Sequence, residues 1–264
     1  VLPLPFVHGW DVAGVVEETG YGVSRFEVGD RVFGMPCFPR QAGGYAEFVT
    51  APARQLAAMP TGLSFAEAAA LPLAALTAWQ MLVDVARVTA GQRILVSAAA
   101  GGVGHLAVQI AKARGAYVIG TARAAKHPFL RELGVAEAVD YTAAPVQELV
   151  RDVDVVIQMF GGDAGLGALE CLRPGGIMVN AQAAWTPGLH ERAAELRVRA
   201  YDYLVEPDAA GLEEVANLVR SGELRVHIAE QLPLSDAARA LSTIASGRTN
   251  GKIVLTVLDA EETP

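Results

Sequence analysis

The hydrophobic positions in the middle of the chain fall into short apolar runs separated by longer amphipathic stretches. The runs predict strands at 93–98, 117–121, 153–159 and 176–180, and the stretches between them predict helices that begin near residues 102, 127 and 163. Strands and helices that alternate in this way are typical of a parallel sheet with helices on both faces. The middle of the chain is therefore expected to be an α/β domain with a doubly wound sheet.

The two ends of the chain follow other patterns. Residues 1–60 contain β-prone runs at 12–18 and 45–49 between glycine-rich turns, which predicts a small antiparallel barrel. Beyond residue 205 the pattern predicts a helix at 209–220, a helix that is capped within 232–235 and ends near 246, and a strand at 251–257.

A helix-start signal lies between the first segment and the α/β segment. Ser64 and Glu67 have the spacing of a capping box, which places the beginning of an alanine-rich helix at this point. Pro72 is expected to break that helix, and a second helix is predicted over 75–85.

The glycine turn after the first predicted strand of the α/β segment is the most informative motif. Ala99, Gly101 and Gly104 match a dinucleotide-binding fingerprint, with alanine in the first glycine position. Small residues let the backbone approach a pyrophosphate, and the open amides at the helix start attract its charge. Four residues are expected to bind a cofactor here: Ala100, Gly101, Gly102 and Val103. The alternative is a turn that serves only the fold.

The residues after the second predicted strand indicate which nicotinamide cofactor is used. Unphosphorylated NAD is usually held by an acid about twenty residues past the glycines, whereas this chain has Thr121, Ala122 and Arg123 there, and no Asp or Glu over residues 85–131. Arg123 and Lys126 are expected to bind a 2′-phosphate, which favours NADPH. The alternative is that both are solvated residues at a helix start.

Composition narrows the class of protein. The 264 residues are 52% hydrophobic and 19% charged, with a formal net charge of −8 and no basic block, which argues against nucleic acid as a partner. No apolar run is long enough for a membrane span. Two cysteines, far apart in sequence, give neither a disulfide framework nor metal-ligand spacing, which favours a reducing, cytoplasmic location.

Several motifs occur in the order found in one known family. They are Pro5–Gly14, Val28–Gly34, Gly43–Glu47, Ala69–Trp79, Ala98–Gly104 and Gly251–Leu255. In these segments the chain resembles the zinc-independent medium-chain dehydrogenases/reductases, and the quinone oxidoreductase branch in particular. The resemblance covers the whole chain.

That resemblance implies a two-domain fold. A GroES-like β-barrel catalytic domain would comprise residues 1–73 and 205–264, and a Rossmann cofactor domain would comprise residues 74–204. Part of the barrel domain is expected to precede Val1, since the chain does not begin with methionine. A homodimer is also expected, formed through an exposed edge strand at 176–180.

The zinc-dependent members of the family have Gly-His-Glu where this chain has Gly9-Trp10-Asp11. Near Leu73, where they carry a further ligand, no Cys, His or acid occurs, so no metal is expected. His8 is expected to be structural or to line the cleft, and Tyr45 to be structural. The catalytic residues are left open.

The resemblance also implies further cofactor-binding residues at six places along the chain. They are Thr77, Tyr141, Phe160 and Gly161, Ala181 and Gln182, Leu204 and Val205, and Asn250. Gln158 stands where the family often has an acid. Tyr141 has a packing role at a strand end as its alternative.

The expected function is transfer of a hydride from NADPH to a quinone or an α,β-unsaturated carbonyl, with a small electrophilic molecule as the partner. Two alternatives stay open at this point. One is an enoyl-thioester reductase of the fatty acid or polyketide type, either separate or part of a larger synthase. The other is an NADPH-binding redox sensor without turnover.

Overall fold

The computed structural model describes residues 4–181 and 185–257. The chain divides into two compact units, one comprising Val1–Leu76 and Glu206–Pro264, and the other Thr77–Val205. They are called unit 1 and unit 2 below. The boundary between Leu76 and Thr77 lies inside helix α2 (Pro72–Trp79).

Unit 2 is built on a parallel sheet of six strands. They are β4 (Arg93–Val96), β5 (Tyr117–Thr121), β6 (Glu137–Val139), β7 (Val153–Gln158), β8 (Leu172–Ala181) and β9 (Arg199–Tyr203). Their spatial order is β6-β5-β4-β7-β8-β9, and every neighbouring pair is parallel. Counted from β4, the order is that of the doubly wound dinucleotide-binding fold, whose direction of winding reverses between β4 and β7.

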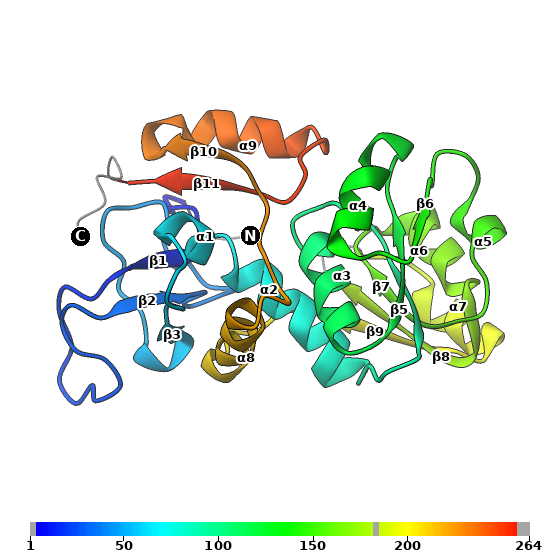
Figure 1. The fold of residues 1–264 in the computed structure, drawn as a ribbon, viewed down its shortest axis with the longest axis horizontal. Coiled ribbons are helices and arrows are strands. Elements are labelled where there is room, and N and C mark those ends of the chain that lie inside the picture. The colour runs from blue at the N-terminus through cyan, green and yellow to red at the C-terminus, as the bar shows by residue number, and fades with distance from the viewer. Residues whose placement is uncertain (1–3, 182–184, 258–264) are drawn as a thin grey trace. The chain divides into compact units, whose positions relative to one another are not determined.

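The helices of unit 2 connect successive strands. They are α3 (Gly104–Ala113), α4 (His127–Leu133), α5 (Val146–Leu149), α6 (Gly162–Leu169) and α7 (Leu189–Leu196), with a short 3-10 turn at Ala124–Lys126. Right-handed crossovers that run in opposite directions from β4 and β7 place α3 and α4 on one face and α6 and α7 on the other (Figure 1). Leu95, Ile119, Val156 and Met178 belong to the core cluster of the unit.

Unit 1 contains two small sheets. Strands β1 (Val12–Val15), β2 (Arg31–Gly34) and β3 (Leu56–Ala58) form an antiparallel sheet, and β10 (Ile228–Pro233) and β11 (Lys252–Thr256) form a parallel pair. The helices are α1 (Phe65–Ala69), α8 (Ala209–Arg220) and α9 (Ala237–Ala245), with 3-10 turns at Ala53–Gln55 and Leu234–Asp236. Phe26, Val32 and Leu56 form a core cluster beneath the antiparallel sheet.

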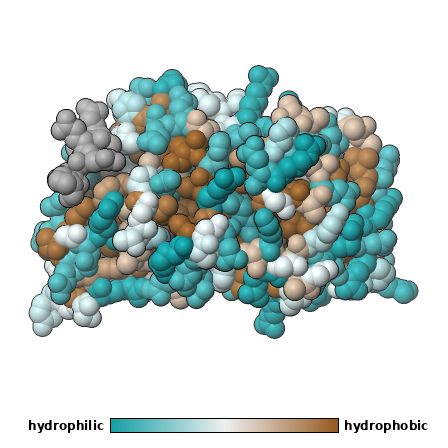
Figure 2. All heavy atoms as spheres, viewed as in Figure 1, coloured by the Kyte–Doolittle hydropathy of each residue, from teal (hydrophilic) through white to brown (hydrophobic). Residues whose placement is uncertain are grey.

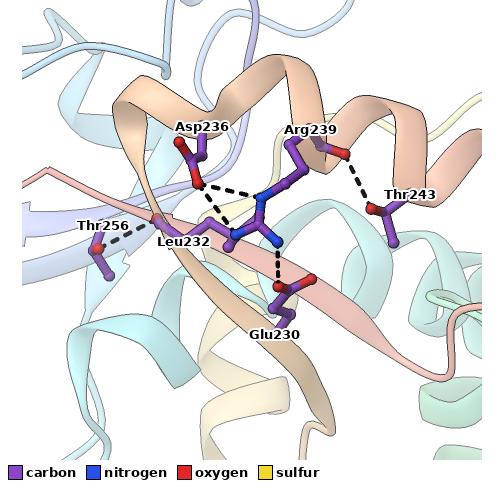
Figure 3. A network of polar contacts seen from close by, with 6 residues as sticks. All are labelled: Glu230, Leu232, Asp236, Arg239, Thr243 and Thr256. Atoms are coloured by element: carbon purple, nitrogen blue, oxygen red, sulfur yellow. Dashed lines mark hydrogen bonds and ion pairs between the residues drawn. The ribbon is translucent and has the colours of Figure 1, made fainter.

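A polar network joins α9 to the parallel strand pair (Figure 3). The Arg239 guanidinium contacts Asp236 at 3.1 Å and Glu230 at 2.8 Å, and the Thr256 hydroxyl donates to the Leu232 carbonyl at 3.3 Å. The hydrogen bonds that Arg239 donates to Glu230 and to Asp236, in that order of effect, raise the pKa of Arg239. Since these ion pairs are exposed, they fix the orientation of α9 more than they stabilise the unit.

The expected strand at 45–49 is wrong, because residues 45–49 form bends and irregular chain. The amides of Gly44 and Tyr45 each donate at 2.9 Å to the carbonyls of Gly9 and His8, respectively. The pairing extends no further along the chain. The Tyr45 ring lies against Gly9, where any side chain would overlap it.

The role assigned to Pro72 is also wrong in part, because this proline begins a helix and does not merely break one. Proline is favoured at the first helical position, where its missing amide has no intrahelical partner to lose. Helix α2 therefore begins three residues before the expected position 75, and a π-helical stretch, Gln80–Val85, continues it to the expected end.

Several strands, among them β6, β9 and β10, lie where no strand was predicted from the sequence. Strand β9 pairs with β8 along its whole length, so residues 176–180 are inside the sheet and the expectation of an exposed edge there is wrong. The edge strands of this sheet are β6 and β9. Strand β10 ends at Pro233, and the 3-10 turn and α9 follow it directly, so the segment 232–235 is partly strand.

The capping box at the start of α1 forms as expected. The Ser64 hydroxyl accepts the Glu67 amide at 3.2 Å, and the Glu67 carboxylate accepts the Ser64 amide at 2.9 Å. Ser64→Ala should lower the free energy of unfolding by about 1 kcal/mol, since it removes one cap and leaves its partner unpaired. Urea unfolding measures this change. Ser235→Ala, at another exposed serine, is the control, and an equal loss in both variants would contradict the prediction.

Hydrophilic residues predominate on the face shown in Figure 2, and they interrupt the hydrophobic patches. Within residues 4–181 and 185–257, the longest helices are too short or too polar to cross a membrane.

Candidate cofactor site

Most of the residues expected to bind a cofactor lie at the carboxyl ends of the strands in the unit 2 sheet. Each follows or ends a parallel strand, and parallel strands present their carboxyl ends at the same edge. From β4 to β9 in chain order, they are Ala100–Val103, Thr121–Arg123 with Lys126, Tyr141, Phe160 and Gly161, Ala181, and Leu204 and Val205. Thr77, in α2, belongs to the same unit. The six strand ends therefore supply one continuous candidate site.

The glycine turn between β4 and α3 is tightly packed. The Gly101 amide donates to the Ala98 carbonyl at 2.8 Å, and Ala98 has a positive φ of 49°. A Cβ atom on Gly104 would overlap the Ala98 carbonyl and the Ala99 backbone. Only glycine fits there, because the first turn of α3 lies directly against the end of β4.

The start of α3 leaves backbone amides open. Helix α3 begins at Gly104, two residues after the expected position, and Val103 precedes it without a side-chain cap. In the described ranges 4–181 and 185–257, the amides of Gly102 and Val103 have no hydrogen-bond acceptor. Open amides and the positive end of the helix dipole together favour an anionic group at this point.

A second anion-attracting feature follows β5. The Lys126 amide donates to the Arg123 carbonyl at 2.8 Å, so both cations belong to one short turn. Partial burial and then the positive charge of Arg123 lower the pKa of Lys126. The Arg123 Nε donates to the Tyr141 hydroxyl at 3.3 Å, and no ion pair of Arg123 occurs among the described residues. Two neighbouring positive side chains, of which Arg123 forms no ion pair with a described carboxylate, favour the binding of a phosphate group. The turn that carries Arg123 and Lys126 is called the cationic turn below.

Asp140 holds this cationic turn in place, and the sequence analysis missed it. Its carboxylate accepts the Ala124 amide at 3.1 Å and the Thr142 amide at 2.9 Å. Hydrogen bonds, chiefly that from the Thr142 side chain, lower the pKa of Asp140. An Asp with a Thr two residues later is a signal for such a local turn.

A further missed residue joins the two strands at which the winding reverses. The Ser97 hydroxyl, at the end of β4, accepts the Met159 amide, at the end of β7, at 2.7 Å. Gln158, where an acid was noted as common, donates to the Ala164 carbonyl at 3.0 Å and is buried. A polar residue directly after the apolar run 93–96 was the available signal for Ser97.

Two of the expected residues do not belong to this set. Gln182 lies outside the described residues. Asn250 belongs to unit 1, next to Gly251, and its side-chain oxygen Oδ1 is buried without a hydrogen-bond partner. Such an oxygen favours a polar ligand group as its partner, because an unpaired buried acceptor costs free energy.

Comparison with known proteins identifies the family of the chain. Residues 1–61 match the alcohol dehydrogenase GroES-like domain, and residues 133–255 match the zinc-binding dehydrogenase family. A quinone oxidoreductase of Pseudomonas aeruginosa is 33% identical over 96% of this chain and 82% of its own length. The solved quinone oxidoreductase of Coxiella burnetii is 36% identical, with a TM-score of 0.92 over 97% of this chain and 80% of that one.

The chain belongs to the medium-chain dehydrogenase/reductase superfamily. The members of this family are oxidoreductases that bind a nicotinamide cofactor, and the chain has the GroES-like domain and the Rossmann-like domain of the family. The polyketide synthase GfsB of Streptomyces halstedii is 38% identical over 97% of this chain, which spans only 5% of that protein's length. The relatives of the chain in this superfamily therefore include both separate reductases and parts of much larger proteins.

Trp10 and Asp11, at the positions where the zinc-dependent members have His and Glu, form other contacts in the described residues, 4–181 and 185–257. No group of three or more His, Cys, Asp or Glu side chains there is arranged to hold a metal ion. The Trp10 indole donates to the Arg40 carbonyl at 2.7 Å, and the Asp11 carboxylate accepts the Leu73 amide at 2.6 Å. Both residues are therefore occupied in holding the fold.

The Tyr45 phenol of this dehydrogenase/reductase is a poor candidate for a proton donor. Partial burial and then the Asp11 carboxylate raise the pKa of Tyr45, so that the phenol gives up its proton less readily. Its ring lies 6.1 Å from that of His8, which also contacts Phe6. Tyr45 and His8 are thus part of an aromatic cluster in unit 1.

The two thiols should differ in reactivity. Burial raises the pKa of Cys171 to about 12, whereas Cys37 is partly exposed. Since the thiolate is the reactive form, a disulfide reagent at neutral pH should modify Cys37 in the folded protein and both cysteines after denaturation. Cys37→Ser should abolish modification of the folded protein. Rapid modification of Cys171 in that variant would contradict the burial of its thiol.

Proposed function

We propose that this chain is a zinc-independent oxidoreductase that uses NADPH to reduce a quinone or an α,β-unsaturated carbonyl compound. The cationic turn at Arg123 and Lys126 carries the proposal. It lies at the end of β5, where an acid would bind the ribose of unphosphorylated NAD. It also follows the strand next to β4, whose glycine turn leaves open amides for a pyrophosphate.

The residues described above fit such a cofactor at each charged group. The Gly102 and Val103 amides would bind the pyrophosphate, and Gly104 permits the close approach of backbone that this requires. Arg123 and Lys126 would neutralise the 2′-phosphate, with Tyr141 and Asp140 orienting the turn. Asn250 Oδ1 would accept a hydrogen bond from a polar group of the cofactor or acceptor.

NADPH, when bound, supplies the hydride, so the protein's part is to bind, orient and exclude water. Thr77, Phe160, Gly161, Ala181, Leu204 and Val205 are proposed to border its nicotinamide half. A quinone takes its protons from water, so this class of acceptor needs no acid from the protein. Conjugated carbonyl compounds place the developing charge on an oxygen that a few hydrogen bonds stabilise.

Reduction of an enoyl thioester is the second candidate, and the similarity to a polyketide synthase favours it. Both candidates use the same cofactor site and differ only in the acceptor. The acceptor panel below therefore decides between them.

The test is NADPH oxidation with three acceptors: benzoquinone, a linear enone and a crotonyl thioester. Each is repeated with NADH and with a metal chelator. NADPH-selective turnover that the chelator does not affect supports the proposal, and the acceptor with the highest kcat/KM identifies the branch. Turnover that the chelator abolishes would overturn the zinc-independent part. Tight NADPH binding without turnover would identify a cofactor-binding sensor.

We also propose that the protein acts in the cytoplasm as a homodimer. Strand β9 is an exposed edge of the sheet in unit 2, with Tyr201 and Leu204 exposed on or beside it. Such an edge offers unpaired backbone groups to a second copy of the chain. A monomeric mass in solution at micromolar concentration would contradict the dimer.

A further inference from the structure

One hydrogen bond joins the two ends of unit 2 along the chain. The Tyr203 hydroxyl donates to the Gln80 side-chain oxygen Oε1 at 2.9 Å, across a separation of 123 residues. Gln80 is 4% exposed. Tyr203 is half-buried, so the bond is partly shielded from water. Such a contact competes less with solvent than an exposed one, and it fixes the relative position of the two segments that carry it.

The Gln80 end of this bond lies beside Thr77. Gln80 is the first residue of the π-helical stretch that continues α2, and it follows Thr77 by three residues. Residues three apart on a helix are neighbours on its surface, so fixing the Gln80 side chain fixes the face that carries Thr77. Short π-helical stretches widen a helix locally and are frequent at functional sites.

The Tyr203 end lies at the candidate site as well. Tyr203 is the last residue of β9, and its Cα is paired in register with that of Ala181, the last residue of β8. Leu204 and Val205 follow it directly, at the point where the chain leaves the sheet. The Tyr203–Gln80 bond therefore links three segments that are proposed to border the nicotinamide. These segments carry Thr77, Ala181, and the pair Leu204–Val205.

We infer that Tyr203 and Gln80 are positioning residues for the nicotinamide half of the cofactor. The inference rests on the proposed function, and it assigns different roles to two parts of the candidate site. The glycine turn and the cationic turn bind the adenosine and phosphate half, whereas the Tyr203–Gln80 bond sets the spacing of the segments around the reacting ring. Small displacements at a reacting centre lower rates steeply, even when overall binding changes little.

The test uses Tyr203→Phe, which removes only the donor, and Gln80→Met, which removes the acceptor and keeps the length of the side chain. Tyr201→Phe is the matched control, because Tyr201 lies two residues earlier on the same strand and is 47% exposed. For each variant, three quantities are measured: the affinity for adenosine 2′,5′-bisphosphate, the affinity for NADPH, and kcat with benzoquinone.

Tyr203→Phe and Gln80→Met are each expected to lower kcat about tenfold and to weaken NADPH binding. Their affinity for adenosine 2′,5′-bisphosphate, which lacks the nicotinamide, should stay within about twofold of the unmodified protein. The double variant should lose less than the sum of the losses in the two single variants, because the Tyr203–Gln80 bond is removed in all three. Tyr201→Phe should change none of these quantities.

Three results would overturn the inference. The first is a Tyr203→Phe protein that behaves like Tyr201→Phe in both kcat and NADPH affinity. The second is equal weakening of NADPH and of adenosine 2′,5′-bisphosphate, which would indicate a general structural role. The third is additive losses in the double variant. Failure of the unmodified protein to bind either ligand is a distinct outcome, which overturns the proposed function and this inference with it.

Discussion

Replacing Arg123 and Lys126 together by alanine should weaken NADPH binding at least about tenfold and leave NADH binding nearly unchanged. A hydrogen bond to a charged group contributes roughly 1.5–3 kcal/mol, and about 1.4 kcal/mol corresponds to a tenfold change in affinity. Both cations belong to one short turn, in which the Lys126 amide donates to the Arg123 carbonyl at 2.8 Å. Fluorescence titration with each cofactor measures the selectivity directly.

The matched control removes two positive charges elsewhere in unit 2. Arg131→Ala with Arg199→Ala changes the net charge by the same amount, at residues that are exposed on α4 and at the start of β9. This variant should keep the NADPH preference, since long-range attraction between exposed charges is screened by salt. Equal weakening of both cofactors by the Arg123 and Lys126 substitutions would contradict the assignment of the 2′-phosphate.

Gly104→Ala should abolish or severely weaken the binding of both cofactors alike. The added methyl group would overlap the Ala98 carbonyl and the Ala99 backbone, which have no flexible side chain to move aside. Alanine ordinarily stabilises a helix by up to about 1 kcal/mol relative to glycine. Here the overlap outweighs that gain, so the free energy of unfolding should fall by about 1–3 kcal/mol. Cofactor titration and urea unfolding measure the two effects.

Gly20→Ala provides the control for this substitution, because a Cβ at Gly20 meets open space. It should leave both stability and cofactor affinity unchanged within error. Gly101→Ala should have an intermediate effect, since its Cβ would lie 3.2 Å from the Ala98 carbonyl oxygen. A folded Gly104→Ala protein with normal affinity for NADPH and NADH would show that the glycine turn serves only the fold.

Much of unit 2 could be predicted because its signals are local. The apolar run before the glycines and the amphipathic stretch after them specify β4 and α3 within a few residues. Strand β9 gave no such signal: its sequence, Arg-Ala-Tyr-Asp-Tyr, is largely polar because it lies at the edge of the sheet and is mostly exposed. Residues 45–49 have β-prone side chains, but their backbone bonds go to only two residues of another segment.

The candidate site likewise contains features that could be predicted from the sequence and features that could not. Glycines with a fixed spacing and a missing acid could be recognised from the sequence, because each acts through its own backbone or charge. Asp140 acts by orienting a neighbouring turn, and Tyr203 contacts a glutamine 123 residues away. The fold brings such partners together from distant parts of the chain, so no short stretch of sequence contains both interacting residues.

Helix α2 has a consequence for any attempt to take this protein apart. The boundary between the units falls between Leu76 and Thr77, inside the helix, and the Asp11 carboxylate of unit 1 accepts the Leu73 amide in its first turn. A gene cut at this boundary would deprive the fragment that keeps Thr77 of the capped first turn of its helix. The boundary between the two units is thus a poor junction for recombinant fragments. Shuffling the units between homologues would require a junction upstream of Pro72.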